Sequence, residues 1–186
     1  MLPGMHLKKA QMDPFDQYLA KSEEIIATVR SQKEKIKEVA GIFAATILKG
    51  RMVHVFGSGH SRIMVEEMWP RYGSFPGFNP IVELSLTFHN LVVGANGQRQ
   101  AMFLENIPGL AERILRNFDL SSDDSALVIS SSGTNVVPVE MAEQFQAHGI
   151  KVVSLITLAH SLTSSSKRSD KKKLSDFSDL VLDTGA

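Results

Sequence analysis

The stretch MVHVFGSGHSRIMVEEMW, residues 52–69, contains in succession the three parts of an α/β unit. An apolar, partly β-branched run at 52–56 predicts a buried strand. The glycine-containing turn GSGHS follows at 57–61, and the apolar residues after it recur at helical spacing. A turn between a strand and a helix faces the unpaired N–H groups of the first helical turn, which favour an anion. The stretch therefore predicts a parallel α/β sheet with an anion site at one of its turns.

The same alternation of strands and helices continues to the end of the chain. Strands are predicted at 51–56, 80–84, 125–130, 151–156 and 179–183, and helices at about 61–71, 106–118 and 136–147. Strands that are apolar throughout are buried on both faces, and helical crossovers make their sheet parallel. The predicted fold class is α/β, a doubly wound, parallel, five-stranded sheet of three αβα layers, flavodoxin-like, with an N-terminal helical extension. Ligands of such sheets lie beyond the carboxyl ends of the strands, here loops 57–61, 84–90, 130–135 and 157–163.

The first fifty residues form this extension. Apolar residues recur there at helical spacing, and Ser31 and Glu34 in SQKE have the pattern of a capping box, which starts a new helix. We therefore expect two helices, near 13–30 and 32–48, closed by Gly50. They pack on the main domain, 51–186, or form a dimer interface, because they offer more apolar faces than one sheet edge covers.

Composition excludes several classes of protein. The chain has 186 residues, of which 43% are hydrophobic and 22% charged, as expected for one globular domain. Its 20 Lys and Arg balance its 20 Asp and Glu, so no overall field favours nucleic acid or acidic membranes. Without cysteine it has neither disulfides nor thiolate metal sites, and its scattered histidines predict no metal. We expect a cytoplasmic protein without a membrane segment or a cofactor.

The first turn, 57–61, fits a single phosphate better than a nucleotide. A P-loop requires a lysine and a hydroxyl after its last glycine, and GSGHSR has neither in place. A dinucleotide fingerprint requires glycine where Arg62 stands. The turn does offer the Ser58 and Ser61 hydroxyls, the His60 imidazole and backbone amides.

The second turn, SSSGTN at 130–135, repeats this geometry after another buried strand. Polar hydrogen-bonding side chains surround Gly133; they are Ser130, Ser131, Ser132, Thr134 and Asn135. Hydroxyls donate to phosphate oxygens, and the amides of the following helix add their dipole. The alternative is an ordinary serine-rich turn with a helix cap. The number of hydroxyls favours an anion site.

The stretches FGSGHS and ISSSGTN together resemble the two signature loops of the sugar isomerase (SIS) domain family, in its bacterial branch akin to phosphoheptose isomerase. The resemblance covers most of the chain. It implies that Ser130, Ser131 and Ser132 hold the phosphate of a sugar phosphate and that Ser58 and Ser61 contact it. Asn135 stands where the family often has Ser or Thr. The resemblance also implies a dimer or tetramer and a domain that continues beyond residue 186.

Three residues are candidates for moving protons in an aldose–ketose isomerisation, which needs a base. Glu67 lies in the helix after the first turn, Glu105 precedes a predicted helix, and His160 follows the fourth strand. Each has an ordinary alternative, respectively a surface ion pair, a residue beside a helix cap and a solvated imidazole. Alternatives to an isomerase are a phosphosugar sensor or regulatory protein and an amino-sugar phosphate lyase. The basic stretch SSSKRSDKKK, 164–173, is either a solvated loop or a lid.

Overall fold

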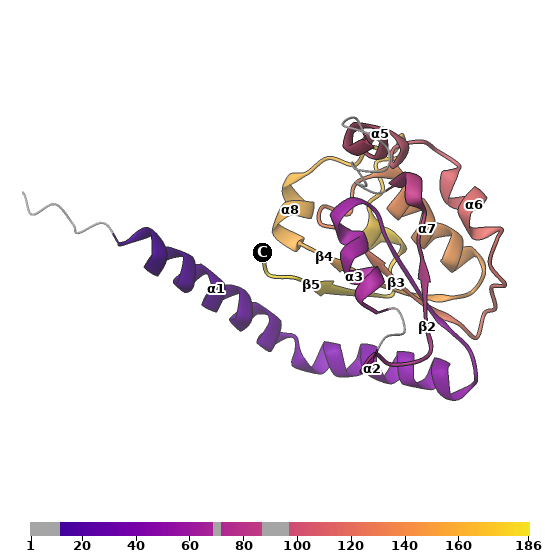
Figure 1. Ribbon diagram of the computed structural model, residues 1–186, viewed down its shortest axis with the longest axis horizontal. Helices are drawn as coiled ribbons and strands as arrows, with labels where there is room; N and C mark the ends of the chain where they lie inside the picture. The colour runs from indigo at the N-terminus through magenta and orange to yellow at the C-terminus, as the bar shows by residue number, and fades with distance from the viewer. Residues whose placement is uncertain (1–11, 69–71, 87–96) are drawn as a thin grey trace, which may run out of the picture.

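The computed structural model describes residues 12–68, 72–86 and 97–186, which form a five-stranded parallel sheet (Figure 1). The strands are β1 (Val53–Gly57), β2 (Phe78–Ile81), β3 (Ser125–Ile129), β4 (Lys151–Ile156) and β5 (Leu180–Asp183). Their order in the sheet is β2-β1-β3-β4-β5. This is the flavodoxin-type order, in which the strands are added in one direction from β1 to β2 and in the opposite direction from β3 onward, so that the strand order reverses between β1 and β3. The predicted fold class is confirmed.

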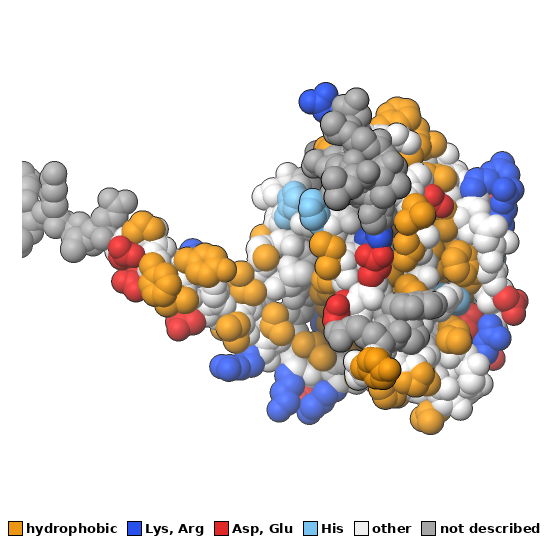
Figure 2. Space-filling view, viewed as in Figure 1, with side chains coloured by type: hydrophobic (Ala, Val, Ile, Leu, Met, Phe, Trp, Pro, Cys, Tyr) orange, Lys and Arg blue, Asp and Glu red, His pale blue; other side chains and the backbone are white. Residues whose placement is uncertain are grey.

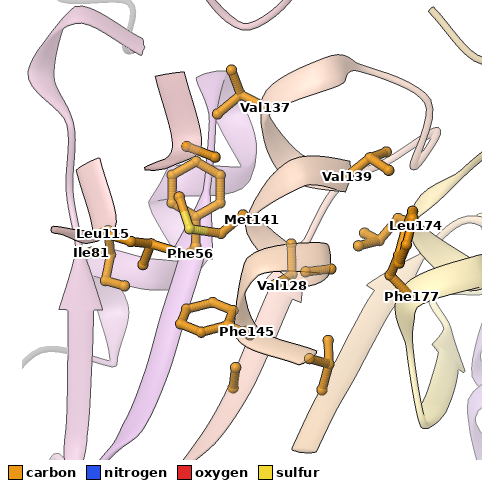
Figure 3. Close-up of a cluster of buried hydrophobic side chains, with 14 of the residues drawn as sticks. Phe56, Ile81, Leu115, Val128, Val137, Val139, Met141, Phe145, Leu174 and Phe177 are labelled. Atoms are coloured by element: carbon orange, nitrogen blue, oxygen red, sulfur yellow. The ribbon is translucent and has the colours of Figure 1, made fainter. Parts of the chain in front are cut away.

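Helices cover both faces of the sheet. They are α1 (Pro14–Ser31), α2 (Lys33–Leu48), α3 (Arg62–Glu67), α5 (Gly97–Leu104), α6 (Leu110–Leu115), α7 (Val136–Ala147) and α8 (Leu158–Thr163). Short 3-10 turns occur at Gly59–Ser61, Leu84–Leu86 and Leu174–Phe177. Because alternate side chains of a strand point to opposite faces, Val55 packs toward α2 and α3, whereas Phe56 packs toward α6 and α7. Figure 3 shows the hydrophobic cluster that contains Phe56, in which Phe145 and Met141 of α7 lie over the sheet.

The N-terminal extension consists of two helices, as predicted, but the predicted cap is wrong. Ser31 is the last residue of α1, and its hydroxyl donates to the Thr28 carbonyl. Gln32 lies between the helices and turns its side-chain amide to the edge strand β5. The amide Nε2 donates to the Asp183 carbonyl at 2.9 Å, and Oε1 accepts from the Asp183 N–H at 2.8 Å. The junction of α1 and α2 is therefore held at β5 by Gln32, whose side-chain amide forms the two hydrogen bonds that a neighbouring strand would form with the Asp183 backbone.

Four other predictions are corrected. The helix expected at 106–118 is shortened to α6, which begins at Leu110 because Pro108 and Gly109 precede it and Gly109 has a φ of 80°; α5, at Gly97–Leu104, was not predicted. The strand expected at 80–84 is β2, which begins at Phe78 and ends at Ile81. Loop 157–163 contains α8. The helix expected at 61–71 ends at Glu67; residues 69–71, like 87–90 of the loop at 84–90, lie outside the described residues.

Candidate functional site

The two predicted turns follow β1 and β3, which are neighbouring parallel strands. Gly57 at the end of β1 lies level with Ile129 at the end of β3, so the turns begin side by side at the carboxyl edge. Gly57 is required there, since a Cβ would lie 2.8 Å from the Ser61 carbonyl oxygen. The first turn therefore folds back closely over the end of its own strand, and Ser58 is buried beneath it.

Glu105 joins the two turns. The Ser58 hydroxyl donates to Oε2 of Glu105 at 2.9 Å, and the Glu105 carbonyl accepts the N–H of Val137 in α7 at 2.9 Å. Glu105 comes directly after the last residue of α5. The sequence had instead predicted that it lies just before a helix at 106–118. The Glu105 carboxylate therefore contacts the first turn, and the Glu105 backbone contacts α7, the helix after the second turn. This places one of the three candidate proton-transfer residues between both turns.

The second turn is held by its own side chains. The Ser130 hydroxyl accepts the N–H of Gly133 at 3.1 Å, and the Ser132 and Thr134 hydroxyls lie 2.8 Å apart. Ser130 and Thr134 are only 7% and 3% exposed. Gly133 has a φ of 63° and faces Leu174, which leaves little room for a side chain. Ser130 and Thr134 therefore shape the turn from inside, whereas Ser132 is only half-buried.

The remaining side chains of the second turn are Ser131, which is exposed, and Asn135, which is half-buried. The Ser131 hydroxyl lies 3.1 Å from Nδ1 of His160, in α8 at the carboxyl end of β4. Ser131 and His160 are both exposed. Asn135 precedes α7, and its side chain makes no capping hydrogen bond to the helix. The structure thus brings His160 to the predicted phosphate turn and leaves the Asn135 amide outside the helix cap.

The helix after the second turn offers fewer amides than the sequence suggested. Val137 donates its N–H to Glu105, and Pro138 has no N–H. Since two of the first three helical residues are thus excluded as donors, the dipole of α7 acts mainly through Val136 and the turn itself.

The other candidate residues of the first turn and of α3 come later in the chain than Gly57 and Ser58, which lie at the end of β1. His60 is exposed in the 3-10 turn, and Ser61 is half-buried at the start of α3. Glu67 is the last residue of α3 and is exposed. At 1.5 Å per residue, about 9 Å of helix separates Glu67 from Ser61. Glu67 therefore stands at the far end of α3 from the turn.

The segment 164–173 supports the second turn. Lys167 and Leu174 donate their N–H groups to the carbonyls of Thr134 and Gly133, at 3.0 and 2.8 Å. Arg168 anchors the segment through Glu143 of α7 and through Asp170, and hydrogen bonding to Arg168 lowers the pKa of Asp170 to about 2. Most of the segment is exposed, as expected of a solvated loop, and backbone hydrogen bonds also tie it to the second turn. These backbone hydrogen bonds join residues far apart in the chain, and no pattern of neighbouring residues in the sequence predicts them.

A cavity of about 480 Å³, whose lining includes Thr46, Asp124 and Lys151, opens at the opposite, amino-terminal edge of the sheet. Among the described residues, no group of three or more acidic or histidine side chains is arranged to hold a metal ion. Within those residues, no helix has the length and apolar character needed to span a membrane.

Comparisons with known proteins agree with the pattern of the turns. A sequence model described as the SIS domain matches residues 17–157. UPF0309 protein BH3325 of Halalkalibacterium halodurans is 32% identical over 173 residues, 92% of this chain and 69% of that protein. UPF0309 protein lin2794 of Listeria innocua is 31% identical over 156 residues, 84% of this chain and 61% of that protein. The chain thus spans about two thirds of the length of these relatives.

Two solved structures share the fold at low sequence identity. A phosphoheptose isomerase from Francisella tularensis matches with a TM-score of 0.56 and 15% identity, over 80% of this chain and 77% of that one. Phosphoheptose isomerase GmhA from Neisseria gonorrhoeae matches with a TM-score of 0.51 and 11% identity, over 92% and 86% of the two chains. At these identities the likeness concerns the arrangement of helices and strands.

Proposed function

Because this chain belongs to the SIS domain family, we propose that it binds a phosphorylated sugar between the turns 57–61 and 130–135. The observation that carries the proposal is the position of Glu105, whose side chain bonds to Ser58 of the first turn and whose backbone bonds to Val137 of α7, the helix that follows the second turn. On one side of it, Ser131, Ser132 and Asn135 offer hydrogen-bond donors to a phosphate. On the other side, the carboxylate and Ser58 face the first turn, where the carbon chain of the sugar would lie.

We further propose that the bound sugar phosphate undergoes aldose–ketose isomerisation, with Glu105 as the base. The Glu105 carboxylate removes the proton from C2, and the electrons of that bond form the enediolate double bond to C1. The carbonyl oxygen gains a proton from His160 or water, the C2 hydroxyl gives its proton back to that same group as the new carbonyl forms at C2, and Glu105 returns its proton to C1. The sequence also offered Glu67 as base, but its place at the end of α3 favours Glu105. A positioned base of this kind typically contributes 10²–10⁴-fold.

A panel of sugar phosphates tests this proposal, with thermal shift as the readout of binding and product formation as the readout of catalysis. At a ligand concentration of 100 Kd, binding stabilises the folded chain by about 2.7 kcal/mol, which is easily measured. The free sugars and inorganic phosphate are the matched controls. Absence of any phosphate-dependent shift across the panel would contradict the proposed site.

Ser132→Ala should weaken binding of a sugar phosphate by roughly tenfold to a hundredfold. The substitution removes one charge-assisted hydrogen bond, which costs about 1.5–3 kcal/mol. Titration calorimetry measures the change, and Ser165→Ala is the control, since Ser165 is exposed outside the turn. Ser132 also accepts the N–H of Thr134 at 3.3 Å, so the unfolding temperature of the variant is measured in parallel. Equal affinity in the two variants would remove Ser132 from the phosphate site.

A sensor that binds a sugar phosphate without converting it is the second candidate. The exposure of Ser131 and His160 favours it, because proton transfer from carbon generally requires a site closed to water. The two functions share the phosphate turn and differ only in turnover. Stabilisation by several sugar phosphates with no product from any of them would identify the sensor.

A further inference from the structure

The second turn, 130–135, carries no charged side chain of its own. Its residues are serines, glycine, threonine and asparagine, and the first turn of α7 has neither an acidic nor a basic residue. A phosphate monoester carries about −1.5 to −2 charges at neutral pH. Val137 and Pro138 give the site no helix amide, so neutral hydroxyls would face most of that charge. A phosphate at this turn therefore calls for a cation from another part of the chain.

The segment 164–173 reaches the second turn through its backbone. Lys167 donates its N–H to the Thr134 carbonyl at 3.0 Å, and Leu174, directly after the segment, donates to the Gly133 carbonyl at 2.8 Å. A Cβ built on Gly133 would lie only 3.2 Å from Cβ of Leu174. The turn and the segment are thus in direct contact at two neighbouring peptide groups. Within this fully described segment, Lys167 is the basic residue whose backbone bonds to the turn.

Internal bonds give the segment a fixed shape. Ser166 is only 7% exposed, and its hydroxyl donates to the Lys172 carbonyl at 2.6 Å and accepts the N–H of Arg168 at 3.2 Å. Arg168 is held to Glu143 of α7 by an ion pair of 2.6 Å. The residues on either side of Lys167 are therefore anchored, and the backbone of Lys167 is held at the turn.

Three of the five basic residues in the segment already have partners for their charge. Arg168 forms ion pairs with two carboxylates. The Lys172 ammonium lies 5.0 Å from the centre of the Phe177 ring. The Lys173 ammonium donates to the Ser161 carbonyl at the end of α8. These three charges hold the segment itself in place.

The other two basic residues, Lys167 and Lys171, are both exposed. Within the described part of the chain, neither side chain makes a hydrogen bond, an ion pair or a ring contact. Lys171 has a φ of 63°, and its N–H bonds to the Arg168 carbonyl at 3.3 Å. A lysine ammonium sits on a flexible four-carbon stem, so it can reach an anion beside the turn that its own backbone touches. Lys167 thus brings an unengaged charge to the second turn, and Lys171 is its counterpart without a bond to that turn.

Another group of lysines lies on α2. Figure 2 shows positively charged side chains gathered where α1 meets α2, the part of α2 that carries Lys33, Lys35 and Lys37. Lys35 donates to the Val181 carbonyl of β5 at 3.1 Å, and Lys37 pairs with Glu34. In the sheet, β4 separates β5 from β3, the strand that leads into the second turn. This group therefore belongs to the β5 edge of the sheet rather than to the phosphate turn.

We propose that the Lys167 ammonium binds the phosphate group beside Ser132 and supplies the positive charge of the site. The inference rests on the proposed sugar phosphate site and adds segment 164–173 to its binding surface. Lysine binds phosphate as a point charge, so the hydroxyls of the turn set the orientation and Lys167 sets the charge preference. The site thereby favours a dianionic phosphate ester over a neutral sugar.

Lys167→Gln should weaken phosphate binding by about tenfold to a hundredfold. Glutamine keeps the backbone N–H that bonds to Thr134, so the segment stays attached to the turn. Inorganic phosphate is the first probe, and the sugar phosphate that gives the largest thermal shift is the second; both are titrated by calorimetry. Lys167→Arg, which keeps the charge, should retain the affinity. Lys171→Gln is the matched control and should bind as the wild type does.

Salt dependence separates a charge contact from a structural role. The gap in affinity between wild type and Lys167→Gln should shrink as salt is raised, because salt screens an exposed ammonium. Loss of a purely structural contact would leave the gap nearly constant.

Chemical protection tests the wild-type chain directly. Saturating phosphate should slow the acetylation of Lys167 by acetic anhydride, followed by mass spectrometry, and should leave that of Lys171 unchanged. If the wild type binds phosphate but Lys167→Gln binds it equally well, or Lys167 is not protected, this inference is overturned and the proposed function stands. If the wild type binds neither probe, both are overturned.

Discussion

Glu105→Gln should lower the turnover of a sugar phosphate by about two to four orders of magnitude while leaving its binding nearly unchanged. Glutamine keeps the shape of the side chain, and its amide oxygen can still accept the Ser58 hydroxyl, which lies 2.9 Å from the carboxylate. Amide oxygen is too weak a base to remove a proton from carbon. The substitution therefore removes the proposed chemistry and retains the link between the turns.

Steady-state kinetics of the substrate found in the panel measures this effect, with kcat separated from KM. Glu112→Gln is the matched control, since Glu112 is an exposed glutamate in the first turn of α6 and should have little effect. Glu67→Gln is measured beside it. If Glu105→Gln retains full kcat and Glu67→Gln loses it, Glu67 is the base; if both retain it, attention passes to His160.

The sequence predicted where the two turns of this site lie in the sheet, but it did not predict the hydrogen bonds that link them to other parts of the chain. Apolar strands followed by polar turns located both loops, because the carboxyl ends of neighbouring parallel strands must meet. The bond between Ser58 and Glu105 joins residues 47 apart in the chain, and neither residue has a local signal for it. The Pro108–Gly109 pair carries a turn signal, and α6 begins directly after it, at Leu110.

A similar distinction holds for the N-terminal helices. Their existence followed from apolar spacing and their junction from the SQKE pattern, yet the cap that this pattern suggested does not form. Gln32 instead satisfies backbone groups of Asp183, 151 residues away, and such a long-range pairing outweighs a local capping preference. Tertiary contacts also account for the difference between Ser130 and Ser131. Both stand in one serine run, but only the structure separates the serine that supports the turn from the one that faces solvent.

Asp124→Asn should destabilise the fold by about 3–5 kcal/mol at neutral pH, because it breaks a buried charge pair and leaves donors without an acceptor. The Asp124 side chain is fully buried, and Asp124 directly precedes β3. Its carboxylate accepts two hydrogen bonds from Arg51, at 2.9 and 3.0 Å, and one from the N–H of Ser121 at 2.8 Å. Nε2 of His54 lies 3.2 Å away, and Asn79 donates to the other ring nitrogen, so Nε2 carries the proton given to Asp124.

The pH dependence of this loss distinguishes the charge from simple packing. Burial alone would raise the pKa of Asp124, but the hydrogen bonds from Arg51 and its other donors lower it to about 2. Since the folded pKa lies below the unfolded value, the stabilisation is complete above about pH 4 and is lost as the pH falls through about 2. The difference between wild type and Asp124→Asn should therefore shrink by roughly 2–3 kcal/mol over that interval.

Urea unfolding at a series of pH values measures both the loss at neutral pH and its decline in acid. Asp123→Asn is the control, because the neighbouring Asp123 is 58% exposed and pairs with Lys49 on the surface, where such pairs contribute about 0–1 kcal/mol. The network lies at the amino-terminal edge, opposite the two turns, so the folded Asp124→Asn variant should still bind its ligand. A loss at neutral pH no larger than that of Asp123→Asn would mean that Arg51 and the buried backbone donors find water when the charge is removed.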